Sequence, residues 1–116
     1  MTIELDILIK ARELISTPEK WTQEVLALDR YGCAHDTVMN DFNLVTEASC
    51  YCGEGAVMVA NALLNGNWDT PRRVMGFLTL VMNQRLYRYN DTHTHEEILN
   101  KFDEAIKFVK LKEAQE

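Results

Sequence analysis

Apolar residues recur at helical spacing in four stretches of the chain, with charged residues between them. In the first stretch, residues 2–15, the apolar positions lie on one side of a helix that Thr2 can cap. The second stretch, 43–65, contains Gly53 and Gly55, which favour a break between two helices or a close helix crossing. Both stretches are therefore predicted to be helical.

The third and fourth stretches predict two longer helices. The centre of the third, 74–82 within a helix over 70–88, is apolar nearly all round, so we expect it to be the buried central helix. The fourth begins at Thr94, which can form a capping box with Glu97 because each side chain satisfies the other's free backbone N–H group. Its lysines gather in the last turns, where the helix dipole favours positive charge.

The segment from residue 21 to 33 is ambiguous, because its apolar residues fit either a short helix or a strand. Asp29-Arg30-Tyr31-Gly32 has the composition of a turn. We expect a short helical turn followed by an extended connection or a short β-hairpin near 25–36. Residues 36–42 are expected to be a loop in which Asp41 caps the next helix.

These elements predict an all-α protein, a single domain over 1–116 with four to six helices. A chain of 116 residues with 47% apolar residues can bury a core without metal or disulfides. No apolar run approaches the length of a membrane span. The interleaved acids near the start are unlike a signal peptide, so we expect a cytoplasmic protein.

The charge distribution argues against nucleic-acid binding. The chain has 12 Lys and Arg against 18 Asp and Glu, a net charge of −6, and it has no Lys or Arg between Tyr31 and Pro71. The negative electrostatic potential of such a surface repels phosphate groups. The acidic surface either keeps a small protein soluble or docks on a basic partner surface.

The three cysteines, Cys33, Cys50 and Cys52, are an odd number, which fits free thiols in a reducing cytosol better than a disulfide framework. Together with His35 they resemble a Cys₃His zinc set. On a helix, however, Cys50 and Cys52 would point about 200° apart and could not share one ion. We expect them to be small buried apolar residues.

A second group of candidate ligands lies just before the last helix. Asp91, His93 and His95 offer carboxylate and imidazole groups for Zn²⁺ or Mn²⁺. His95 would lie inside the helix and His93 outside it, so the two need not converge. In the alternative interpretation Asn90 and Asp91 make turn hydrogen bonds while Thr94 caps the helix, and this predicts no metal and no cofactor.

The strongest candidate surface combines arginines with aromatic residues, the types that dominate binding hot spots. It consists of Arg72, Arg73, Arg85 and Arg88 on the predicted helix over 70–88, with Trp68 before its start and Tyr87 and Tyr89 at its exposed end. In the alternative interpretation Arg85 and Arg88 complement the helix C-terminus and pair with the acidic first half of the chain.

Short motifs spread along the chain resemble an uncharacterised family of bacterial and bacteriophage proteins, known only as a domain of unknown function. The matching segments are Ala11 to Trp21, Asp29 to Gly32, Cys52-Gly53-Glu54-Gly55-Ala56, Asn90-Asp91, Thr94-His95-Glu96-Glu97-Ile98 and Phe102-Asp103-Glu104-Ala105-Ile106. Ile98 departs from the usual Val, and the region from Trp68 to Tyr87 matches no motif. The resemblance implies a small cytosolic helical protein of phage origin and supplies no activity.

We therefore expect a non-enzymatic interaction or regulatory protein, such as a phage or prophage accessory protein that binds and modulates a host defence protein. Two alternatives belong to other classes. One is a small metal-dependent enzyme that uses Asp91, His93 and His95 with Cys52. The other is a self-assembling oligomer that binds a nucleotide or another small ligand, in a pocket lined by Arg72, Arg73, Trp68 or Tyr89.

Overall fold

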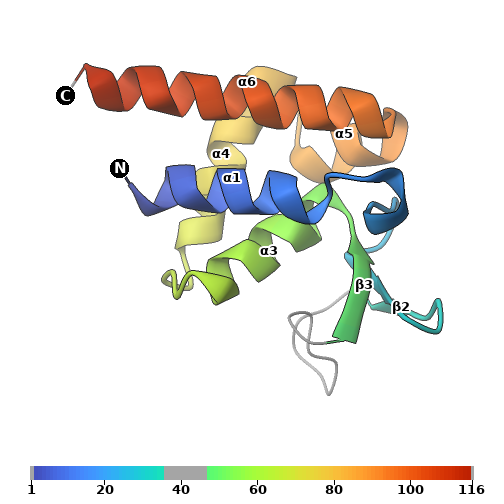
Figure 1. Cartoon of the computed structure of the whole chain (residues 1–116). Helices are drawn as coiled ribbons and strands as arrows, with labels where there is room; N and C mark the ends of the chain where they lie inside the picture. The colour runs from blue at the N-terminus through green and yellow to red at the C-terminus, as the bar shows by residue number, and fades with distance from the viewer. Residues whose placement is uncertain (1, 36–46, 116) are drawn as a thin grey trace.

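A computed structural model describes residues 2–35 and 47–115, and this part of the chain contains five α-helices and one small sheet (Figure 1). The helices are α1 (Ile3–Leu14), α3 (Gly53–Leu63), α4 (Thr70–Met82), α5 (Leu86–Thr92) and α6 (His95–Ala114). The strands are β1 (Ala27–Asp29), β2 (Ala34–His35) and β3 (Ala48–Tyr51), and a single 3₁₀ turn, η1, spans Pro18–Lys20. The predicted helical class and the range of four to six helices are confirmed.

Helix α1 lies at the centre of the helical layer, between α6 and α3, and also contacts α4 (Figure 1). Its apolar stripe, which includes Leu5, Ile7 and Leu8, is buried, as the helical spacing predicts. Helix α6 runs antiparallel to α1 and contributes the fully buried Phe102. The core therefore forms where α1 meets the long C-terminal helix and α3.

The prediction of a buried central helix over 70–88 is wrong in two respects. Helix α4 ends at Met82, because Asn83 adopts a left-handed conformation with φ 57°, and a new helix, α5, begins at Leu86. Only one face of α4 is buried, and Leu80, at its centre, is 68% exposed. None of the described helices has both the length and the apolar character needed to cross a membrane.

The hairpin, one of the alternatives expected near 25–36, is confirmed, whereas the short helical turn expected before it is not observed in residues 21–26. Strands β1 and β2 pair in antiparallel register, with Ala27 opposite His35. In the turn between them, the Asp29 carboxylate accepts hydrogen bonds from the backbone N–H groups of Tyr31 and Cys33. Gly32 has φ 81°, a conformation that favours glycine.

The break expected near Gly53 within 43–65 is confirmed, but the helix expected before that break is not present in the described residues Ala48–Tyr51. Residues Ala48–Tyr51 form β3, which pairs antiparallel with β1, so the sheet order is β2-β1-β3. The break falls at Cys52, whose backbone N–H donates to the Leu26 carbonyl oxygen at 3.0 Å before α3 begins. Pairing with a strand some twenty residues away thus overrides the local helical pattern. The predicted cap at Asp41 lies outside the described residues.

The two predicted helix caps have different outcomes. Thr94 and Glu97 form the expected capping box at the start of α6, with both hydrogen bonds present. Thr2 lies at the N-cap position of α1, but its side chain makes no cap hydrogen bond. Its hydroxyl and backbone N–H instead donate to the Glu113 carboxylate near the end of α6. This contact fixes the two chain ends side by side.

Candidate functional site

The break between α4 and α5 creates a groove beside α4. The backbone of Arg85 is extended, at φ −65° and ψ 145°, and the next side chain, that of Leu86, is buried in the core. Arg85 and Tyr87 therefore lie on either side of a buried residue. Together with Arg72, Gly76 and Thr79 of α4 and Glu54 of α3, they line a space of about 410 Å³. We call this space, defined by those six residues, the arginine groove. Its volume is in the range of ligand-binding clefts.

The two arginines of the groove are not used by the fold. Among the hydrogen bonds and ion pairs of the described chain, none involves the guanidinium group of Arg72 or Arg85. Both side chains are exposed, and Tyr87 is 47% exposed. By contrast, Arg12 pairs with Asp103 at 2.6 Å between Nε and Oδ1. The groove therefore presents two guanidinium groups that are available to an external anion.

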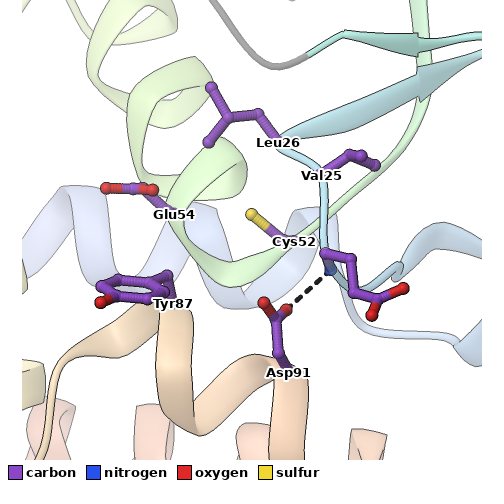
Figure 2. Close-up of a pocket in the computed structure, with 7 residues that line it drawn as sticks. Val25, Leu26, Cys52, Glu54, Tyr87 and Asp91 are labelled. Atoms are coloured by element: carbon purple, nitrogen blue, oxygen red, sulfur yellow. Dashed lines mark hydrogen bonds between the residues drawn. The ribbon is translucent and has the colours of Figure 1, made fainter.

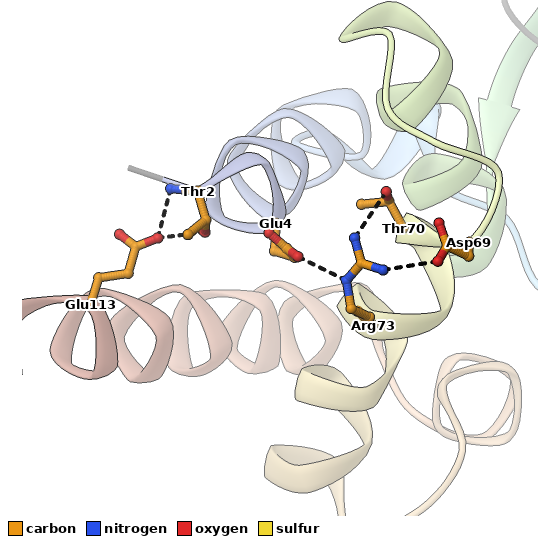
Figure 3. Close-up of polar contacts among 6 residues, drawn as sticks. All are labelled: Thr2, Glu4, Asp69, Thr70, Arg73 and Glu113. Atoms are coloured by element: carbon orange, nitrogen blue, oxygen red, sulfur yellow. Dashed lines mark hydrogen bonds and ion pairs between the residues drawn. The ribbon is translucent and has the colours of Figure 1, made fainter. Parts of the chain in front are cut away.

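Arg73, the third candidate on α4, has a structural role (Figure 3). Its Nε donates to Glu4 at 2.9 Å, and its Nη1 to Asp69 at 3.2 Å. The hydrogen bond from Arg73 lowers the pKa of the Glu4 carboxyl below its ordinary value, although burial opposes the shift. Arg73 therefore ties α4 to α1, and it does not line the groove.

The remaining predicted interface residues lie outside the groove. Trp68, which precedes α4, is 85% exposed, and Arg88 is exposed on α5. Tyr89 is not at an exposed helix end as expected, because it belongs to the buried face of α5. Its ring stacks on that of His93, with centroids 3.6 Å apart and an interplanar angle of 4°. Tyr89 is therefore not available to a nucleotide or a partner.

A second cavity, of about 240 Å³, adjoins the groove and shares Glu54 and Tyr87 with it (Figure 2). We call it the cysteine cavity, because Cys52 lies between Glu54 and Asp91 in its wall. The Cys52 sulfur accepts a hydrogen bond from the N–H of Gly55, and burial raises the pKa of its thiol to about 11. A thiol that is protonated at neutral pH caps α3 and is poorly suited to nucleophilic attack.

The carboxyl groups of the cysteine cavity also have local partners. The Asp91 carboxylate accepts a hydrogen bond from the backbone N–H of Glu24 at 2.7 Å (Figure 2). Glu24 has φ 72°, an uncommon conformation for a residue with a side chain. The pKa of Glu54 is raised, first by burial and then by the nearby charge of Asp91. The protonated form of Glu54 is thus favoured more than it would be in water.

The candidate metal ligands do not converge. The His93 ring nitrogen Nδ1 lies 3.0 Å from the Tyr89 carbonyl oxygen, whereas His95 Nε2 lies 2.6 Å from the Ile15 carbonyl oxygen. Asp91 is not in a loop as expected, because it belongs to α5. Across the described ranges, no group of three or more His, Cys, Asp or Glu side chains is arranged to hold a metal ion.

All three cysteines are free thiols. Cys50 and Cys52 are buried, and Cys33 is exposed at the hairpin. The prediction that Cys50 and Cys52 point apart on one helix is wrong, because Cys50 lies in β3 and Cys52 follows that strand. The burial of Cys50 and Cys52 agrees with the expectation that the cysteines are small core residues, whereas the exposed Cys33 contradicts it. The described residues do not place Cys33 in the cysteine cavity.

Sequence reasoning missed the principal buried polar residue, Asn90, which was assigned to a turn. It lies in α5 and is completely buried. Its Oδ1 accepts hydrogen bonds from Trp21 Nε1 at 2.7 Å and from the Gly53 N–H at 2.9 Å, and its Nδ2 donates to the Thr22 carbonyl oxygen at 3.0 Å. We call these four residues the asparagine hub. It joins three separate segments of the chain through one side chain.

Close packing beside the hub also explains Gly55. A Cβ atom at this position would lie 2.2 Å from the Leu26 carbonyl oxygen, so no side chain fits there. The same carbonyl accepts the hydrogen bond from Cys52. The start of α3 is therefore locked against the strand segment, and Gly55 is required by the fold.

Comparison with known proteins supplies a family but no activity. The model of a family of unknown function, DUF6197, matches residues 2–108. This match confirms the resemblance to an uncharacterised family. No curated protein and no solved structure matches the chain.

Proposed function

The chain belongs to DUF6197, a family of unknown function, and we propose from its geometry that it is a non-enzymatic interaction protein whose arginine groove binds an acidic segment of a partner protein. The observation that carries this proposal is the pair of unpaired guanidinium groups, those of Arg72 and Arg85, in the lining of one groove. Arginine is the residue best suited to bidentate recognition of a carboxylate.

The surroundings of the groove supply an apolar contribution to binding. Tyr87 forms part of the wall, and Met75 adds an apolar contact. The exposed Leu80 lies close by on α4. Aromatic and arginine side chains grouped with such a surface are typical of binding hot spots. A partner segment that carries a carboxylate beside a bulky side chain would use both features.

The charge of the rest of the chain favours binding in one place. The net charge is −6, and no Lys or Arg occurs between Tyr31 and Pro71. An acidic segment would be repelled from most of this surface and accepted at the groove, so electrostatics would set the register of binding. Because salt screens such charge interactions, we also expect the acidic segment to bind more weakly at high salt.

The proposal extends to the source and compartment of the protein. We propose that it is a phage or prophage accessory protein that acts on a host protein in the cytoplasm. The resemblance to bacterial and bacteriophage proteins supports this source, and the free thiols of Cys33, Cys50 and Cys52 support a reducing compartment. Binding of a host protein through the groove would test the assignment.

One alternative retains a specific observation in its favour. The groove volume and its two guanidinium groups also suit a small anionic ligand such as a nucleotide. Of the four residues proposed to line a nucleotide pocket, however, only Arg72 lies in the groove. A metal-dependent enzyme has no comparable support, because the described residues show no convergent ligand set.

The test is a binding screen with matched variants. Short peptides that combine Asp or Glu with a bulky residue would be screened beside copies in which each acid is replaced by its amide. The proteins are the wild type, the double variant Arg72→Ala with Arg85→Ala, and Arg88→Ala. The control removes an equally charged, exposed residue of α5 that does not line the groove.

We expect the wild type to retain acidic peptides and not their amide copies. The double variant should bind them at least about tenfold more weakly, while Arg88→Ala binds normally. All three proteins should unfold at nearly the same temperature, because neither groove arginine contributes to the fold. Equal loss in Arg88→Ala, or unchanged binding in the double variant, would contradict the proposal. Competition by nucleotides at lower concentration than peptides would favour the alternative.

A further inference from the structure

Gly76 is the feature of the groove that the fold leaves unexplained. It lies in the middle of α4, one turn after Arg72, and it forms part of the groove wall. Glycine is markedly less favourable than alanine inside a helix, because it loses more conformational freedom on folding. A glycine in such a place normally has a packing or functional reason.

No packing reason exists within the described chain. A Cβ atom at Gly76 would meet no atom within 4 Å, and its φ lies in the ordinary range. The chain has five glycines, and each of the other four is explained by its surroundings. Gly53, Gly55 and Gly66 lie against neighbouring atoms, and Gly32 has positive φ. Gly76 alone has open space above a bare helix backbone.

We propose that Gly76 is a specificity-determining position: the bulky side chain beside the partner's carboxylate lies flat on the helix backbone at Gly76. This inference rests on the proposed function. Arg72, one turn earlier on α4, and Arg85 line the same groove and would receive the neighbouring carboxylate. Tyr87 also lines the groove, and the exposed Leu80 lies one turn after Gly76 on α4.

The partner is accordingly a protein segment with an acidic residue next to an aromatic or large aliphatic residue. Charge complementarity to the two arginines selects the acid, and the space above Gly76 selects the bulky neighbour. An acidic residue flanked by small residues would keep only the first contribution. Such a segment would therefore bind more weakly.

The test uses Gly76→Ala and Gly76→Leu with the best acidic peptide from the screen. Both variants should raise the melting temperature by a few degrees, since both replace glycine with a better helix former. Binding should fall by about threefold for alanine and at least about tenfold for leucine. Asn100→Ala is the matched control. It also places a better helix former at an exposed position, on α6 away from the groove, and it should leave binding unchanged.

A second peptide separates steric blocking from other effects. In this peptide the bulky residue is replaced by glycine, and we expect the loss caused by Gly76→Leu to shrink to less than about threefold. A lower melting temperature for Gly76→Ala would show that the fold requires the glycine, and this result would overturn the proposal.

The remaining outcomes distinguish the two proposals. Normal binding by Gly76→Leu, together with loss in the double arginine variant, would overturn the role of Gly76 and leave the proposed function standing. An equal loss with both peptides would also overturn it. If the wild type binds no acidic peptide better than the double arginine variant does, the proposed function fails, and the role of Gly76 fails with it.

Discussion

The asparagine hub and the arginine groove both include residues of α3 and α5, but they differ in how completely the chain satisfies its own polar groups. In the hub, one buried amide side chain holds three segments through short hydrogen bonds. In the groove, Arg72 and Arg85 face open space. Gly55 and Gly76 show the same contrast, because a Cβ atom clashes at the first position and meets nothing at the second.

This difference separates scaffold from candidate function. Three of the segments that carry the family resemblance, those ending at Trp21, containing Gly53 and beginning at Asn90, meet at the hub. The family model spans residues 2–108, so it covers the groove as well as the hub. The hub accounts for how three segments of the chain are held together, and the groove is where we propose that a partner binds.

The largest expected effect is that of Gly55→Ala. The added methyl group would overlap the Leu26 carbonyl oxygen, a backbone atom that cannot move without disturbing the sheet. We expect a loss of about 4 kcal/mol in the free energy of unfolding, measured by urea denaturation. The same change at Gly76 should stabilise the protein, so equal effects at the two positions would contradict the contrast.

Asn90→Ala should have the next largest effect. It leaves the buried N–H groups of Trp21 and Gly53 without their acceptor, which should cost about 3 kcal/mol in urea denaturation. Asn100→Ala, the exposed counterpart on α6, should change stability by no more than about 0.5 kcal/mol. A hub variant as stable as this control would show that the network does not hold the segments together.

Glu54→Gln should have the smallest effect, and its sign depends on pH. Because the pKa of Glu54 is raised in the folded state, its contribution to stability is fully present at low pH and is lost as the pH rises through that pKa. Glutamine resembles the protonated form, so the melting temperature should rise by about 1–2 °C at pH 7. Near pH 4 the difference from the wild type should shrink.

The same variant sharpens the assignment of the groove. Removing the carboxylate of Glu54 takes away a negative charge from the wall that receives the partner's acid. Acidic peptides should therefore bind a few-fold more tightly to Glu54→Gln at neutral pH. Weaker binding would indicate that Glu54 attracts the ligand and that the ligand is not an anion.

Local signals in the sequence predicted the parts of the fold that depend on neighbouring residues. The capping box of Thr94 and Glu97 and the turn at Asp29 to Gly32 need partners only a few positions away. Strand β3 could not be predicted in this way, because only Tyr51 of its four residues favours strands and its partner β1 lies far along the chain. The end of α4 at Asn83 had a local signal, because the apolar run over 74–82 gives way there to an asparagine, a residue type that commonly ends helices, but the prediction of one helix over 70–88 did not use it.

The groove was predicted only in part. Arg72, Arg85 and Tyr87 were identified by residue type, since arginine and aromatic residues mark binding surfaces. Arg73 and Tyr89 have the same types but are used by the fold, and only their three-dimensional contacts reveal this. Gly76 gave no sequence signal, because an open glycine and a tightly packed one look alike.

The most direct test of the account is hydrogen–deuterium exchange of the wild-type protein with and without a bound acidic peptide. If the groove is the binding site, the peptide should slow exchange in 72–79 and 85–87 and leave 21–24 and 52–53 unchanged. Slower exchange around Cys52 and Glu24, with none along α4, would place the ligand in the cysteine cavity and contradict the central claim.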